Sequence, residues 1–105
     1  MVSIEVLQEA TQRLVQKFHP QRIILFGSQA RGTAHPRSDV DLLVISRVSG
    51  KRRPLMVEMS RALCDLNAAF EVVVLTPEEF DMDRQIPGTI GRYASLEGKI
   101  LYERA

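Results

Sequence analysis

Residues 22–45 read RIILFGSQARGTAHPRSDVDLLVI, and this stretch decides the fold. Two apolar runs, Arg22–Phe26 and Val40–Ile45, have the composition of β-strands. Between them, a Gly-Ser pair opens a short helical turn that we predict over Ser28–Arg31. Polar residues gather where one strand ends and the other begins, which indicates a functional site built on the ends of a sheet.

Asp39 and Asp41 lie one residue apart at the start of the second run, so their side chains point to the same face of a strand. Asp41 interrupts an otherwise apolar strand, where a carboxylate is costly unless it is paired, hydrogen-bonded or bound to a metal. Oxygen ligands suit Mg²⁺, and two carboxylates can bridge a pair of ions. The alternative is a polar end of a loop, in which Ser38 or Asp39 caps a turn before the strand. This alternative explains Asp39 but explains Asp41 poorly.

The Gly27-Ser28 turn offers backbone N–H groups and a hydroxyl to a phosphate. Residues 27–33 read G-x-x-x-x-G-T, close to a P-loop, but the lysine that follows the second glycine of a P-loop is absent. The spacer to Asp39 is also too short for the helix that a P-loop opens, so we exclude that motif. A turn with a purely backbone role remains the alternative.

A third acid, Glu71, opens the predicted strand Glu71–Leu75. If this strand lies beside Val40–Ile45, Glu71 reaches the same site. It could there bind a second ion or take the proton from an incoming hydroxyl. Alternatively, Glu71 is only the exposed first residue of a strand, a position where a glutamate needs no functional explanation.

The rest of the chain alternates helical and strand patterns and predicts an α/β fold, with a small mixed sheet flanked by helices. Ser3 and Thr76 are predicted helix caps, and Thr76 has the spacing of a capping box with Glu79. The further elements we expect are helices over 4–18 and 87–97, a helix beginning at Pro54, an exposed basic loop at 49–53 and a last strand over 99–102.

Length, composition and charge narrow the class of protein. The 105 residues, 45% hydrophobic and 26% charged, predict one domain over 1–105 with a modest core. The net charge of +1 argues against a general nucleic-acid-binding surface, although it leaves a local basic patch open. The single cysteine, Cys64, and the lack of a signal or membrane segment favour a cytoplasmic protein. Tyr93 and Tyr102 are interpreted as packing residues.

Two motifs, FGSQARG at 26–32 and SDVDLLV at 38–44, resemble the signature of the minimal nucleotidyltransferases of the polymerase-β superfamily. The stretches VVVLTPEEF at 72–80 and LEGKILYE at 96–103 are also similar to that family. The resemblance therefore covers nearly the whole chain, and it implies the nucleotidyltransferase fold.

The resemblance also implies roles for the site residues. Gly27 and Ser28 would hold the triphosphate of ATP or another NTP, and Asp39 and Asp41 would bind Mg²⁺. Glu71 stands where the family usually has a third carboxylate from Asp. Glu is one methylene longer than Asp, and positioning errors of that order slow catalysis. Arg31 is a phosphate contact by its position, with an exposed helix-end charge as the alternative.

A chain of this size leaves no second domain to select an acceptor, so we expect acceptor recognition from another chain or from self-association. The resemblance implies a HEPN-type partner in a toxin–antitoxin pair, with this chain as the antitoxin. Two functions follow. The first is Mg²⁺-dependent transfer of a nucleoside monophosphate, AMP from ATP, to a hydroxyl on the partner. The second is a binding module that neutralises the partner by direct contact without catalysis.

Overall fold

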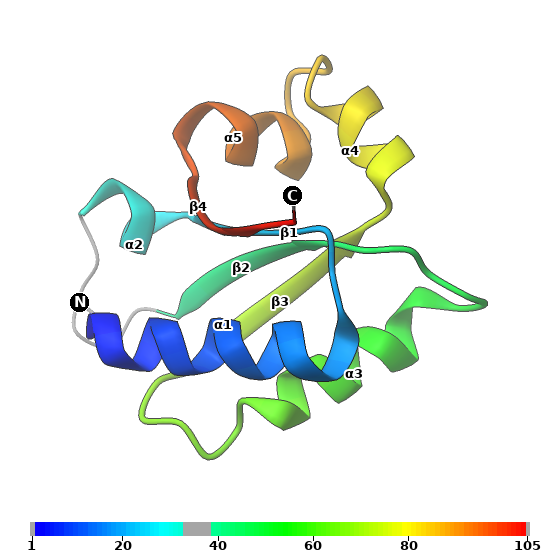
Figure 1. The fold of residues 1–105 in the computed structure, drawn as a ribbon. Coiled ribbons are helices and arrows are strands. Elements are labelled where there is room, and N and C mark those ends of the chain that lie inside the picture. The colour runs from blue at the N-terminus through cyan, green and yellow to red at the C-terminus, as the bar shows by residue number, and fades with distance from the viewer. Residues whose placement is uncertain (1, 33–38, 105) are drawn as a thin grey trace.

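The computed structural model describes residues 2–32 and 39–104, so Ser38, named above as a possible cap, lies outside them. Helices and strands alternate along the chain, as predicted for an α/β fold (Figure 1). In chain order the elements are α1 (Ile4–Phe18), β1 (Arg22–Phe26), α2 (Ser28–Arg31), β2 (Val40–Ile45), α3 (Arg52–Ala62), β3 (Phe70–Leu75), α4 (Pro77–Asp83), α5 (Ile90–Glu97) and β4 (Lys99–Glu103).

The four strands form one mixed sheet in the order β3-β2-β1-β4, which confirms the predicted sheet. β1 pairs antiparallel with both β2 and β4, whereas β2 and β3 run parallel. In this register Asp41 lies opposite Phe26 on one side and opposite Glu71 on the other. The condition set for Glu71, that its strand neighbours β2, is therefore met.

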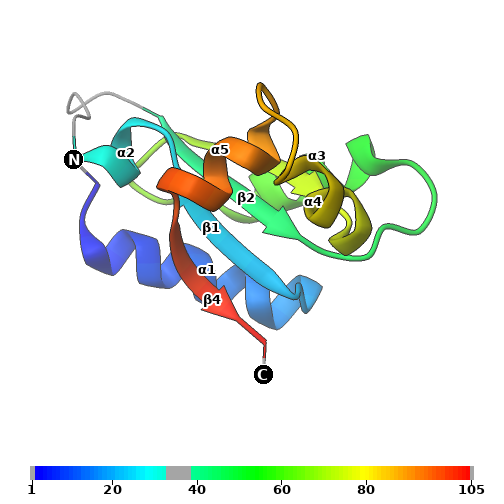
Figure 2. The same cartoon turned by 90° about the horizontal axis from the view of Figure 1, so that it is seen from above.

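Helices cover both faces of the sheet. Figures 1 and 2 show α1 and α3 on one face and α4 and α5 on the other. The first face packs on Leu14 of α1 and Met59 of α3, and the second on Phe80 of α4 and Ala94 of α5. β2 alternates between these two core clusters, which explains why its run is apolar on both sides.

Local caps act as predicted at two helices. The Ser3 hydroxyl accepts the Val6 N–H at the start of α1. At α4, the Thr76 hydroxyl accepts the Glu79 N–H while the Glu79 carboxylate accepts the Thr76 N–H, completing the capping box. These side chains satisfy N–H groups that a helix start leaves without intrahelical partners.

The predicted start of the third helix is wrong by two residues. Arg52 already belongs to α3, so the exposed basic loop is shorter than 49–53. The Arg52 guanidinium forms an ion pair with Glu79 of the α4 capping box at 2.6 Å. This tertiary contact favours the helical conformation at position 52. The last helix also differs from the prediction, because it starts at Ile90, where the Thr89 hydroxyl accepts the Arg92 N–H.

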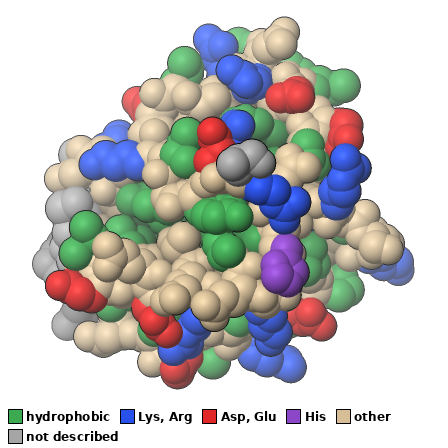
Figure 3. All heavy atoms as spheres, viewed as in Figure 1, with side chains coloured by type: hydrophobic (Ala, Val, Ile, Leu, Met, Phe, Trp, Pro, Cys, Tyr) green, Lys and Arg blue, Asp and Glu red, His purple; other side chains and the backbone are tan. Residues whose placement is uncertain are grey.

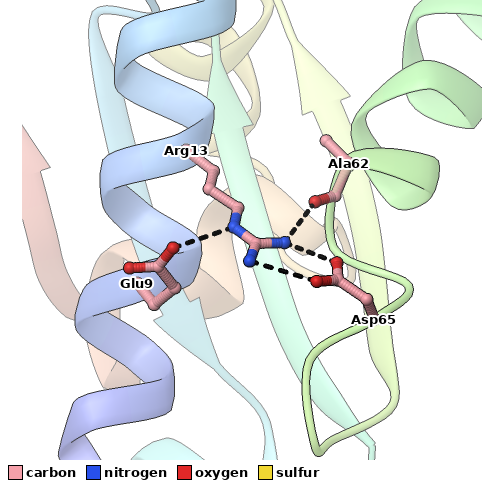
Figure 4. A network of polar contacts seen from close by, with 4 residues as sticks. All are labelled: Glu9, Arg13, Ala62 and Asp65. Atoms are coloured by element: carbon pink, nitrogen blue, oxygen red, sulfur yellow. Dashed lines mark hydrogen bonds and ion pairs between the residues drawn. The ribbon is translucent and has the colours of Figure 1, made fainter.

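Arg13 ties α1 to the end of α3 (Figure 4). Its guanidinium donates to both carboxylate oxygens of Asp65, at 2.5 and 3.2 Å, and to the Ala62 carbonyl oxygen at 3.0 Å. Glu9, one turn earlier on α1, accepts the Nε–H at 3.0 Å. The hydrogen bonds from Arg13 lower the pKa of the Asp65 carboxyl below its ordinary value. This network joins two helices on the same face of the sheet.

Asp65→Asn is expected to lower the Tm at neutral pH, because it removes the charge that Arg13 holds in two hydrogen bonds. The folded-state pKa of Asp65 is lowered, so its stabilisation is present above about pH 4 and is lost as the pH falls through the folded-state pKa. Thermal unfolding across pH should therefore show the variant and wild type converging in acid. Equal Tm values at pH 7 would contradict the role of the network.

Within the described residues, every helix is too short or too polar to cross a bilayer.

Candidate active site

The three predicted acids lie at one end of β2 and β3. Asp41 is half-buried in a strand whose other residues are all buried. Asp39 precedes the strand and is exposed, and Glu71 is exposed opposite Asp41. Asp41 shares the side-chain direction of Leu43, which packs in the cluster on the α4 and α5 face. The acids therefore belong to that face of the sheet, at the edge where β1 ends.

Burial and the negative charges of its neighbours both act on the ionisation of Asp41. The pKa of the Asp41 carboxyl is raised, first by burial and then by the charge of Glu71 and a hydrogen bond between the two side chains. The charge of Asp39 raises it further, whereas Arg31 lowers it. The structure thus brings Asp39, Asp41, Glu71 and Arg31 within electrostatic reach of one another, and a cation placed there would relieve the repulsion.

Gly27 joins the Gly-Ser turn to the acids. Its φ of +76° and ψ of −157° are accessible to glycine and strained for other residues. A Cβ at this position would collide with Oδ2 of Asp41. The turn can therefore approach the carboxylate only because position 27 has no side chain. Ser28 follows as the half-buried first residue of α2.

Arg31 ends α2 and reaches toward α5. Its guanidinium carbon lies 5.6 Å from the centre of the Tyr93 ring, and its Nη1 lies 3.8 Å from Oε2 of Glu97. Tyr93 in turn meets Phe26 edge to face, with ring centres 6.4 Å apart. Tyr93 is a packing residue as predicted, but it also contacts a predicted site residue. Neither this second contact nor Glu97 was identified from the sequence, which shows no pattern that pairs them with Arg31.

The acids fit Mg²⁺ by ligand type, because they offer carboxylate oxygens and no nitrogen or sulfur. Across residues 2–32 and 39–104, no three acidic, histidine or cysteine side chains are already arranged around one ion position. Asp41 and Glu71 instead lie close enough for the charge of Glu71 to raise the pKa of Asp41.

A separate groove of about 790 Å³ lies between α1 and the edge strand β4. Figure 3 shows hydrophobic side chains on this face of the molecule, with charged ones around them. Ile4, Leu7 and Leu101 are among the residues that line the groove, and no acidic residue of the described chain does so. The groove is therefore distinct from the acidic cluster.

Comparisons with known proteins identify the family of the chain. A family model described as a nucleotidyltransferase domain matches residues 7–88. A candidate protein adenylyltransferase of Methanocaldococcus jannaschii is 46% identical over 109 residues, covering 94% of this chain and 71% of that protein.

Solved structures share the fold at lower identity. A candidate nucleotidyltransferase from Sulfolobus solfataricus has a TM-score of 0.66 at 19% identity, covering 95% of this chain and 79% of that one. A mutant MntA–HpeT toxin–antitoxin structure has a TM-score of 0.68 at 22% identity, covering 99% and 75%. A toxin–antitoxin structure with AMP-PNP has a TM-score of 0.60 at 22% identity, covering 92% and 73%. From the family match and the 46% identical relative, we conclude that the chain belongs to the nucleotidyltransferase domain family.

Proposed function

We propose that this nucleotidyltransferase transfers AMP from ATP, with Mg²⁺, to a hydroxyl group on a partner protein. The observation that carries the proposal is the close approach of the Gly27 turn to Asp41, because it joins the Gly-Ser turn, a candidate for binding phosphate, to the acidic cluster. The nature of the M. jannaschii relative, a candidate protein adenylyltransferase, supports a protein acceptor. A toxin–antitoxin structure that contains the same fold was solved with AMP-PNP, which supports ATP as the donor.

Each site residue has a role in this proposal. Gly27 and Ser28 hold the triphosphate, and Arg31 contacts a phosphate oxygen. Asp39 and Asp41 bind Mg²⁺, with Glu71 as a third carboxylate. The metal supplies positive charge that stabilises the attacking and leaving oxygens.

The reaction is a substitution at the α-phosphorus of ATP. The acceptor oxygen forms a bond to that phosphorus as the bond to the bridging oxygen breaks, and pyrophosphate leaves. Glu71 takes the proton from the acceptor hydroxyl, which makes the oxygen a better nucleophile. The products are an AMP ester of the acceptor and pyrophosphate.

We propose a HEPN-type toxin as the acceptor, with this chain acting in the cytoplasm as a single minimal domain and as the antitoxin. Two structures of the same fold come from toxin–antitoxin pairs, which supports a protein partner. The partner, or a second copy of this chain, would supply the surface that selects the acceptor.

The direct test is incubation with ATP labelled at the α-phosphate, Mg²⁺ and the product of the neighbouring gene. We expect label on the partner protein, lost when EDTA removes the metal and restored when Mg²⁺ is added back. A complex that forms normally but never acquires label, at any Mg²⁺ concentration, would rule out the transfer reaction.

Glu71 can be tested separately. Glu71→Ala is expected to slow transfer by about 10²–10⁴-fold, because it removes a proposed metal ligand and proton acceptor. Glu71→Asp should retain activity or raise it, since Asp is the residue that the family usually places there. Label transfer measured with both variants decides the role, and an unchanged rate in Glu71→Ala would show that Glu71 takes no part.

A second candidate function is a non-catalytic antitoxin that neutralises its partner by contact. Glu71 favours it, because Glu is one methylene longer than the Asp usual in the family and its carboxylate would be displaced from the position of a third ligand. Under this alternative, Asp39→Ala/Asp41→Ala would neutralise the partner as well as wild type does. If neutralisation depends on catalysis, the double variant should fail to neutralise the partner.

A further inference from the structure

We propose that α5 supplies two positioning residues, Tyr93 and Glu97, which hold the Arg31 guanidinium at the phosphate side of the active site. The inference rests on the proposed function, in which Arg31 contacts the nucleotide phosphates. It adds that α5 sets the position of this contact.

The contacts form a continuous path from α5 to the acids. The Tyr93 ring lies under the Arg31 guanidinium at 5.6 Å, and Glu97, one turn further along α5, lies 3.8 Å from it. Phe26 connects Tyr93 to the sheet. Its ring contacts the Tyr93 ring at an interplanar angle of 77°, and Phe26 lies opposite Asp41 in the register of β1 and β2. The charge of Arg31 acts on Asp41 and lowers its pKa. The guanidinium thus contacts α5, and its charge acts on Asp41 of the acidic cluster.

α5 itself is firmly placed, so it can act as a platform. The Thr89 hydroxyl oxygen, at its start, lies 2.7 and 2.9 Å from the carbonyl oxygens of Asp83 and Ile86, so its one O–H is held at the end of α4. Gly91 approaches α4 so closely that a Cβ would lie 2.7 Å from the Asp83 Cβ. The buried Ala94 packs the helix onto the sheet core.

The chemistry favours positioning over simple charge pairing. Arg31 and Glu97 are 44% and 48% exposed, so their ion pair alone contributes little. A guanidinium stacked on an aromatic face keeps its N–H groups at the edge, free to meet phosphate oxygens. Stacking also restricts a long side chain before the nucleotide arrives, which lowers the entropy lost on binding.

The Tyr93 hydroxyl is not what holds Arg31. Its oxygen is buried and has no hydrogen-bond partner within the part of the chain that the structure describes. The ring is therefore the functional group, and phenylalanine should replace tyrosine without loss.

The chain offers a matched control at the other end of β1. Arg22 lies 5.6 Å from the centre of the Phe80 ring and 3.0 Å from Oε2 of Glu103. The chemistry is the same, but Arg22 lies opposite Ile45 in the register, at the end of β2 away from Asp41. Glu103→Gln should therefore leave nucleotide binding unchanged.

The test is the affinity for AMP-PNP with Mg²⁺, measured by titration calorimetry on the full chain. We expect Tyr93→Leu to weaken binding about threefold to fivefold and Glu97→Gln about twofold, in line with exposed cation–π and ion pairs. Tyr93→Phe should retain wild-type affinity. Arg31→Ala should weaken binding about tenfold or more, in line with a lost charge-assisted hydrogen bond.

The double variants decide whether the effect passes through Arg31. In an Arg31→Ala background, Tyr93→Leu and Glu97→Gln should cause no further loss. An equal further loss would show that α5 acts by general packing, and would overturn the inference. So would unchanged affinity in both single variants while wild type binds AMP-PNP, which leaves the proposed function standing. No binding by wild type at all would overturn the donor site and the inference with it.

Discussion

Asp41→Asn is expected to reduce the rate of AMP transfer by about 10³-fold, because the neutral amide cannot replace the carboxylate that we propose binds Mg²⁺ at the reacting phosphate. The same substitution should raise the Tm. The folded-state pKa of Asp41 is raised, so its ionised form is disfavoured by folding, and removing the charge stabilises the native state. Label transfer and thermal unfolding at neutral pH measure the two effects.

The pH dependence gives a further check on this prediction. Wild-type stability should rise as the pH falls through the raised pKa of Asp41, because the protonated side chain then resembles asparagine. The Tm difference between variant and wild type should therefore shrink in acid. Asp65→Asn is the control with the opposite sign, since the pKa of Asp65 is lowered. An Asp41→Asn protein with a lower Tm and full activity would show that Asp41 has a structural role.

Gly27→Ala is expected to abolish measurable binding of AMP-PNP and to reduce transfer by about 100-fold or more, an effect typical of angstrom-scale misplacement. The new Cβ would collide with Oδ2 of Asp41 and would push the turn away from the acids. The backbone at φ +76° would add strain of about 1–3 kcal/mol. Calorimetry reports the binding loss, and denaturant unfolding reports the strain.

Gly50→Ala is the matched control for this effect. Gly50 has a similar φ of +79°, but a Cβ there would have no other heavy atom within 4 Å. The Gly50→Ala variant should therefore lose stability through backbone strain, while its nucleotide binding stays unchanged. If Gly27→Ala lost stability but still bound AMP-PNP as wild type does, the Gly-Ser turn would have only a backbone role.

Local sequence patterns predicted most element boundaries. The strands β1 and β2 and the short helix α2 match their predicted ranges. Apolar runs, glycines and capping residues act within a few positions of the chain, so they can be read without knowing what packs against them. The start of α3 was missed because Arg52 owes its helical position to Glu79, which lies 27 residues away.

The sequence by itself also determined that Asp41 interrupts an apolar strand and shares the face of Leu43, since side chains alternate along a strand. Only the tertiary structure decided that β3 lies parallel to β2, with Glu71 opposite Asp41. It likewise decided that Gly27 approaches Asp41 closely and that Arg31 packs on Tyr93 of α5. The physical reason is that strand order and helix packing depend on contacts distant in the chain, and no local pattern encodes which charges will meet.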